Sequence, residues 1–257
     1  MSLKPRILGI LFAATLLASA LGAAAQTVTT NHLVTVRAEN EFHRAQAQFQ
    51  SAPNNSTNAW NFARASFEFC EVATNNTQRA EIAKLGIAAC RQLLARESNS
   101  APGHYYLGMC LGKLADAEAP SVAAYRLVYE IEQEFKTAAA LDERFDHAGP
   151  ARTLGELYFL APGWPFSVGS KHKAREWLER AVALAPDYPG NQINLAEAQL
   201  KWRQQTEFET TMKNLDARWA AAQTNFTGVA READWLEWKA RRAALKAEFQ
   251  KIYKSVP

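Results

Sequence analysis

One stretch of the chain, residues 173–200 (KAREWLERAVALAPDYPGNQINLAEAQL), constrains the fold more than any other. Its first part is helical in pattern, because Ala174, Leu178 and Ala181 recur at helical spacing, and Pro186 then interrupts the pattern. Small residues let two helices approach, a large apolar residue fills the groove between them, and proline ends a helix. The stretch therefore predicts the second helix of one hairpin, a turn, and the first helix of the next.

Large–small residue pairs recur where the first helices of such hairpins would lie. The pairs are Phe62-Ala63, Leu107-Gly108, Leu154-Gly155 and Leu195-Ala196. Positions 62, 107, 154 and 195 are separated by 45, 47 and 41 residues. Proline-poor candidate second helices occupy residues 77–96, 123–145 and 171–184 between them. Apolar spacing is helical throughout, without an alternating strand pattern. The sequence thus predicts an all-α array of antiparallel helical hairpins, an α-solenoid.

These hairpin patterns resemble tetratricopeptide repeats, whose standard length is about 34 residues. The longer intervals imply lengthened hairpins or inserted loops. We expect repeat-like helices over about 58–200 and capping helices over about 207–254, within a single domain of residues 26–257. The resemblance implies a chain that binds something and is not an enzyme.

Residues 1–25 have the pattern of an export signal. Lys4 and Arg6 form a basic start, an apolar run follows, and small residues end at Ala25. Cleavage after Ala25 would give an exported, periplasmic protein without a membrane span. The alternative is a retained anchor, since residues 7–25 carry no charge and about 18 apolar residues can cross a bilayer.

The charge balance does not favour nucleic-acid binding. Loss of residues 1–25 would leave 27 Lys and Arg, down from 29, against 26 Asp and Glu, a net charge of +1. A nucleic-acid-binding protein normally carries a concentrated basic face. The basic stretch 239–254 is interpreted as the solvated outer face of a capping helix, with an anionic partner site as the alternative.

The polar residues that often carry chemistry are scattered along this chain. Its histidines show no metal-ligand spacing, and no phosphate loop, dinucleotide fingerprint or nucleophile motif occurs, so we expect no catalytic residue, metal or cofactor. Among the three cysteines, Cys90 and Cys110 are a candidate disulfide pair on facing helices, with Cys70 left over. Buried free thiols are the alternative.

The loop APGWPFSVGS, residues 161–170, interrupts a repeat with two aromatic residues. Proline and glycine restrict its backbone, so Trp164 and Phe166 could close a pocket for a ligand. Alternatively, both rings pack back over the ends of neighbouring helices and seal the core.

The stretch 149–200 resembles a narrower family, the periplasmic T components associated with TRAP transporters. The resemblance is carried by the glycine–proline start, the Leu154-Gly155 pair, the APGWP-S-G loop and the Lys-x-Ala-Arg helix. It implies an exported helical accessory protein that works beside a solute-binding component and binds a small hydrophobic ligand. Members are often lipoproteins, whereas this chain lacks the required cysteine.

Two functions are therefore open: an accessory protein of TRAP-type solute uptake, and a periplasmic scaffold for another exported protein. A scaffold would use residues of the first helices, because tetratricopeptide-type grooves accept extended peptides or helices. The candidate groove residues are Asn61, Arg64, Tyr105, Arg152 and Asn194. The oligomeric state is left open by the sequence.

Overall fold

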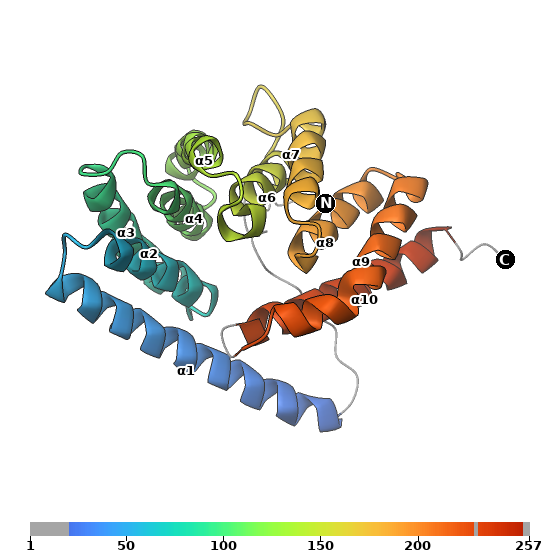
Figure 1. Cartoon of the computed structure of the whole chain (residues 1–257), viewed down its shortest axis with the longest axis horizontal. Coiled ribbons are helices and arrows are strands. Elements are labelled where there is room, and N and C mark those ends of the chain that lie inside the picture. The colour runs from blue at the N-terminus through green and yellow to red at the C-terminus, as the bar shows by residue number, and fades with distance from the viewer. Residues whose placement is uncertain (1–20, 229–230, 254–257) are drawn as a thin grey trace. The chain divides into compact units, whose positions relative to one another are not determined.

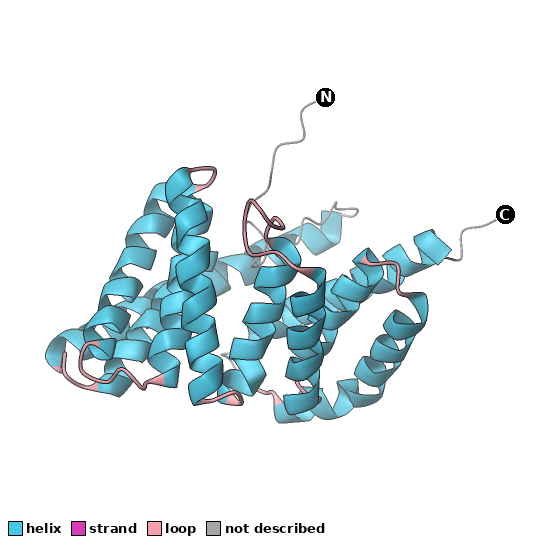
Figure 2. Ribbon diagram, turned by 90° about the horizontal axis from the view of Figure 1, so that it is seen from above, coloured by secondary structure: helices cyan, strands magenta, loops and turns pink. Residues whose placement is uncertain are grey.

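The computed structural model describes residues 21–228 and 231–253, which form ten α-helices and no β-strand within those ranges (Figure 1). The helices are α1 (Leu21–Ser51), α2 (Ser56–Glu71), α3 (Asn76–Leu94), α4 (Ala101–Glu118), α5 (Val122–Leu141), α6 (Phe145–Leu160), α7 (Lys171–Leu184), α8 (Pro189–Lys201), α9 (Gln205–Asn225) and α10 (Glu232–Tyr253). Figure 2 shows the loops that connect them. The predicted all-α class is confirmed.

Side-chain caps explain where several helices begin. The capping residues are Asn55, Asn75, Ser100, Ser121 and Ser170. In each, the side-chain oxygen accepts a hydrogen bond from the backbone N–H three residues further on, which satisfies a donor the helix leaves unpaired. Each cap stabilises its helix by about 1 kcal/mol.

The helices pair as the sequence predicts in the hairpins α2/α3, α4/α5 and α6/α7. Helix α9, which was expected as a capping helix, packs against α8. In α7, Ala174, Leu178 and Ala181 are all buried, and Pro186 lies in the turn that follows. Because these residues were the ones predicted to face a neighbouring helix, the antiparallel hairpin array is confirmed.

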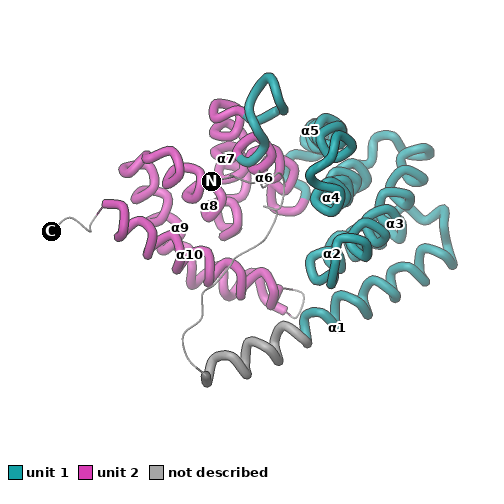
Figure 3. Tube along the Cα trace, turned by 180° about the vertical axis from the view of Figure 1, so that it is seen from behind, with its two compact units in different colours: residues 1–145, 160–169 teal, residues 146–159, 170–257 magenta. Residues whose placement is uncertain are grey.

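The chain divides into two compact units (Figure 3). Of the described residues, unit 1 comprises 21–145 and 160–169, and unit 2 comprises 146–159, 170–228 and 231–253. The single domain expected over residues 26–257 stays a prediction, and each unit is described by itself below.

Unit 1 contains α1 to α5, with α1 packed on α2. Phe42 of α1 lies 5.4 Å from Phe62 and 5.2 Å from Phe69 of α2 between ring centroids. Between α4 and α5, the Phe135 side chain is 1% exposed, and its ring centroid lies 6.0 Å from that of Tyr105. The core of unit 1 is therefore aromatic both where α1 packs on α2 and between α4 and α5.

Unit 2 contains α7 to α10 and nearly all of α6, and its largest core cluster lies where α10 meets α8 and α9. Trp238, Leu245 and Phe249 of α10 are buried there with Phe208 of α9, whose ring stacks on Phe249 at 4.9 Å. Burying this apolar face stabilises the end of the unit. The helix predicted to follow the repeats is present and covers α8 and α9.

The start of α6 departs from the sequence interpretation. The candidate second helix over residues 123–145 was expected to reach residue 145. Instead α5 ends at Leu141, and Asp146, His147 and Ala148 have φ of 47°, 55° and 63°. Left-handed backbone costs roughly 1–2 kcal/mol per residue, so other contacts must hold this turn.

The export signal lies mostly outside the described residues, because residues 1–20 are not among them and residues 21–25 belong to α1. Within the described part of the chain, none of the helices has both the length and the hydropathy that a bilayer span requires. Cleavage after Ala25 stays a prediction.

Candidate functional site

One face of α2 stays partly open to solvent and carries two of the predicted groove residues. Asn61 and Arg64 are half-buried there, and Arg64 forms an ion pair with Glu68 at 3.4 Å. The opposite side of the helix, which includes Phe62 and Ala63, is buried. We call Trp60, Asn61, Arg64 and Glu68 the α2 face.

Aromatic packing fixes the indole at one end of the α2 face. Trp60 is half-buried, and its ring is parallel to Tyr106 of α4, with centroids 5.9 Å apart and planes at 5°. The edge of Phe145 meets Trp60 at 6.4 Å. The indole is thus held in place while part of it stays accessible, which is how interface anchors are presented.

Tyr105, a third predicted groove residue, lies in the core. Its side chain is 2% exposed and touches Tyr106, Phe135 and Phe145, with ring centroids 5.1 to 6.0 Å apart. It therefore does not line an open face. Neighbouring tyrosines on one helix point about 100° apart, and the sequence did not distinguish which of the two faces the second helix.

Arg152, the fourth predicted groove residue, is a structural clamp in unit 2. Its guanidinium donates to the Asp146 carboxylate at 3.0 Å, to the carbonyls of Asp146 and His147 at 3.3 Å, and to Asn191 Oδ1 at 3.2 Å. It also lies 4.8 Å from the centroid of the Tyr188 ring. These bonds hold the left-handed turn and leave Arg152 only 9% exposed.

Asn194, the last predicted groove residue, is 3% exposed and belongs to a charged network. Its amide nitrogen donates to the Glu156 carboxylate, and its oxygen accepts from Arg241 of α10 at 2.6 Å. Arg241 also binds Glu197 through two bonds of 2.8 and 2.6 Å, and Glu237 at 2.7 Å. This network occupies the place where a partner contact was predicted.

Burial changes the acidity of carboxylates in this network. Desolvation raises the pKa of Glu237 to about 7, although the charge of Arg241 opposes the shift. Desolvation likewise raises the pKa of Glu156, against the charges of Arg241 and Arg152. Sequence reasoning missed Arg241 because stretch 239–254 was interpreted as a solvated basic face. The one signal available was that apolar residues flank Arg241, since Trp238 and Leu245 are three and four positions away.

Unit 1 holds a second buried charge cluster, at the ends of α2 and α4. Lys113 is 3% exposed, forms an ion pair with Glu71, and lies 5.1 Å from the centroid of the Phe67 ring. Desolvation raises the pKa of Asp116 to about 7, with Lys113 lowering it and Glu71 raising it further. Asp116 Oδ1 is buried without a hydrogen-bond partner, which fits a protonated carboxyl.

The two loop aromatics are directed into solvent. Trp164 is 89% exposed and Phe166 is 76% exposed, so the expectation that they seal the core is wrong. The loop is nevertheless ordered by its own backbone: Gly169 N–H donates to the Pro162 carbonyl at 2.9 Å, and Phe166 N–H to the Gly163 carbonyl at 3.1 Å.

The candidate disulfide is not formed in the structure. Cys90 and Cys110 are free and buried, as is Cys70. The Cys110 thiol is directed at the Ala63 carbonyl of α2, 3.4 Å away. Burial raises the pKa of Cys70 to about 12 and raises those of the other two thiols, so none has the acidity of a nucleophile.

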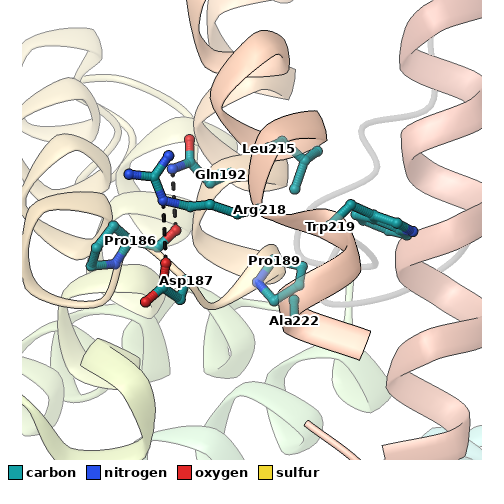
Figure 4. A pocket seen from close by; sticks show the side chains of 8 residues that line it. All are labelled: Pro186, Asp187, Pro189, Gln192, Leu215, Arg218, Trp219 and Ala222. Carbon is teal, nitrogen blue, oxygen red and sulfur yellow. Dashed lines mark hydrogen bonds and ion pairs between the residues drawn. The ribbon is translucent and has the colours of Figure 1, made fainter. Parts of the chain in front are cut away.

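A shallow recess lies between the α7–α8 turn and α9 (Figure 4). Its lining includes Pro189, Gln192 and Trp219, together with Arg218 and Asp187, which form an ion pair at 3.2 Å. Even with the open solvent at its mouth included, its empty space is about 160 Å³, below the roughly 300–1,000 Å³ of typical ligand sites. This recess does not offer room for a drug-sized hydrophobic ligand. Across residues 21–228 and 231–253, no group of three His, Cys, Asp or Glu side chains is placed to hold a metal.

Comparison with known proteins defines the fold class. No family model and no curated protein sequence matches the chain. A solved structure of TTC0263, a thermophilic tetratricopeptide-repeat protein of Thermus thermophilus, is similar with a TM-score of 0.57 and 16% identity, covering 88% of this chain and 97% of that one. Yeast Tom70 aligns with a TM-score of 0.33 and 12% identity, over 83% of this chain and 59% of that one.

The fold is therefore that of an all-α helical-hairpin array. Within that class it is similar to a tetratricopeptide-repeat structure, as the recurring large–small pairs predict.

Proposed function

We propose that this protein is a non-enzymatic scaffold that binds another protein through the α2 face. The observation that carries the proposal is the half-buried Trp60, held by Tyr106 and Phe145 beside Arg64. Tryptophan, tyrosine and arginine are the residues that most often dominate binding energy at interfaces. A ring that is already fixed loses little entropy when a partner covers it.

The polar part of the α2 face suits an extended partner segment. The Arg64 and Glu68 side chains are 39% and 47% exposed, although the Arg64 Nε that faces Glu68 is buried. Both side chains therefore keep exposed parts that a partner can reach. Asn61 adds an amide that can pair with the backbone of a bound peptide.

The proposed setting is the periplasm, with the chain as an accessory component of TRAP-type solute uptake and a solute-binding component as its partner. The signal pattern of residues 1–25 supports export, and the resemblance of residues 149–200 to the T components supports the transporter setting. Expression of the full gene in a bacterium and mass measurement of the periplasmic product tests export. A mature chain that begins at Gln26 is expected, and a product that keeps residues 1–25 would contradict cleavage.

Site-directed cross-linking tests the α2 face. A photoreactive residue at Asn61 is expected to give an adduct of one defined mass with a candidate solute-binding component, and Arg64→Glu should abolish it. Arg126→Glu is the matched control, because Arg126 is exposed on α5 of the same unit and undergoes the same charge change. The scaffold proposal fails if no reproducible protein adduct forms, or if both variants lose it equally.

A further inference from the structure

The loop between α6 and α7, residues 161–170, displays its two aromatic rings to solvent while its backbone is fixed. We propose that this loop is a membrane-contact element that inserts Trp164 and Phe166 into the headgroup region of an anionic lipid surface. The inference goes beyond protein scaffolding, because it concerns a different segment and a different class of partner from the α2 face.

The loop is built to hold its shape. The Gly169 N–H bonds the Pro162 carbonyl at 2.9 Å, and Gly163 and Gly169 form an isolated bridge. A β-carbon at Gly169 would stand 2.0 Å from the Ala161 carbonyl oxygen, so only glycine fits there. Ser167, between the two ends, is 6% exposed. Because the backbone is ordered in this way, the loop itself does not bury its two large rings. They leave water only when a partner surface covers them.

The chemistry of the rings favours a lipid interface. Trp164 is the most exposed large apolar side chain of the described residues, at 89%, and its neighbour Phe166 is 76% exposed. Tryptophan is enriched at membrane–water interfaces because its ring is apolar and its N–H is polar. A projecting pair of rings also needs no partner of fixed shape, whereas the peptide-binding modes of helical proteins use grooves.

The charge of the surrounding sequence favours an anionic surface. From residue 157 to residue 175 the chain carries no Asp or Glu, while Lys171, Lys173 and Arg175 follow the loop. Lys171 and Lys173 are exposed at the start of α7, although each ammonium also lies within 5.4 Å of an aromatic ring centroid. Basic residues close in sequence to an apolar insertion are attracted to anionic headgroups. Two rings give a weak, reversible contact rather than a stable anchor.

Vesicle binding of the full chain tests the proposal. The protein is expected to co-sediment with vesicles of phosphatidylcholine mixed with phosphatidylglycerol. The double variant Trp164→Ser, Phe166→Ser should bind these vesicles at least about tenfold more weakly. Val122→Ser with Tyr129→Ser is the matched control, since these α5 side chains are 70% and 51% exposed in the same unit, and it should leave binding unchanged. Salt, or phosphatidylcholine alone, should weaken binding of the native chain.

A depth measurement separates the loop from residues 7–25, which could themselves bind lipid in an unprocessed chain. Brominated lipid is expected to quench part of the tryptophan fluorescence of bound protein. Trp164→Phe should remove that quenched part and keep the binding. The proposal is overturned if the serine pair binds as well as the native chain, if Trp164→Phe leaves quenching unchanged, or if a photoreactive residue at Phe166 labels a protein and no lipid.

Discussion

The ring of Phe135 lies so close to Gly108 that a β-carbon at residue 108 would stand 2.6 Å from Phe135 Cε1. The same relationship recurs one hairpin later, where a β-carbon at Gly155 would stand 2.6 Å from Leu178 Cγ. In both hairpins, a glycine of the first helix admits a large side chain of the second. This shared geometry shows that the two segments occupy equivalent repeat positions, and it sets how closely their helices approach.

Gly108→Ala is therefore expected to destabilise unit 1 by about 1–2 kcal/mol. Overpacking a core costs about 1–3 kcal/mol, and alanine recovers up to about 1 kcal/mol of helix propensity. Urea unfolding followed by circular dichroism measures the change. Phe135→Leu should cost less in the Gly108→Ala background than in the native chain, because the smaller side chain relieves the contact. Equal costs in both backgrounds would show that the two residues are not coupled.

The sequence predicted the fold well where a repeat position decides the residue type. The facing helix determines the side-chain size at three positions of α7: Ala174 and Ala181 are small, and Leu178 is large. The spacing of these residues in the sequence is enough to reveal the pattern. The turn at Asp146 and His147 was not predictable in this way. Its left-handed backbone depends on Arg152 and Asn191, and Asn191 is 44 residues from the His147 carbonyl to which it donates.

The candidate site was predicted only in part, for a related reason. Helical periodicity assigns residues to faces of a helix, but it does not show what covers each face. Asn61 and Arg64 stay accessible, whereas Asn194 is covered because Arg241 of α10 reaches it. The spacing of α10 residues was readable from the sequence, but the position of α10 against α8 follows from packing with Phe208 and other distant residues.

Asn191 should be among the least replaceable polar residues of unit 2. Its side chain is fully buried, accepts from Arg152, and donates to the carbonyls of His147, Ala181 and Ala185, each at 3.0 Å. Asn191→Ala removes these partners and leaves buried carbonyls unpaired, so we expect a loss of about 3 kcal/mol in the free energy of unfolding.

Asn214→Ala is the control for this measurement, because Asn214 is exposed on α9 and its replacement should change stability by less than about 0.5 kcal/mol. Chemical denaturation of both variants gives the comparison. A small effect of Asn191→Ala would mean that the left-handed turn does not depend on this amide.

Asp116 should make unit 1 less stable as the pH rises. Its pKa is about 7 in the fold, raised mainly by desolvation, against about 3.9 in an unfolded chain. The unfolded chain therefore ionises first, and stability is full below about pH 4 and falls as the pH rises towards 7. Asp116→Asn stays neutral, so it should change little at pH 4 and raise stability by about 2 kcal/mol at pH 8.

Unfolding midpoints at both pH values test this expectation, with Glu81→Gln on the exposed side of α3 as the control for removing one acidic charge. The groups around Asp116 that carry charge are Lys113, Glu71 and Arg79. If Asp116→Asn destabilises the protein at pH 8, the carboxylate is ionised in the fold and bound to Lys113 or Arg79.

Arg241→Met tests the network that covers Asn194. The substitution keeps much of the apolar stem and removes the cation that binds Glu197 and Glu237. Breaking a buried ion pair leaves an uncompensated charge, so we expect a loss of about 3 kcal/mol at pH 8. The charge of Arg241 opposes the desolvation that raises the pKa of Glu156 and Glu237, and without it both values rise further. Carboxyls with raised pKa cost stability only when ionised, so the loss of stability should shrink at pH 5.

Lys239→Met, at an exposed position of the same helix, should have little effect at either pH. A loss that is equal at pH 5 and pH 8 would place the contribution of Arg241 in the packing of its stem rather than in its charge.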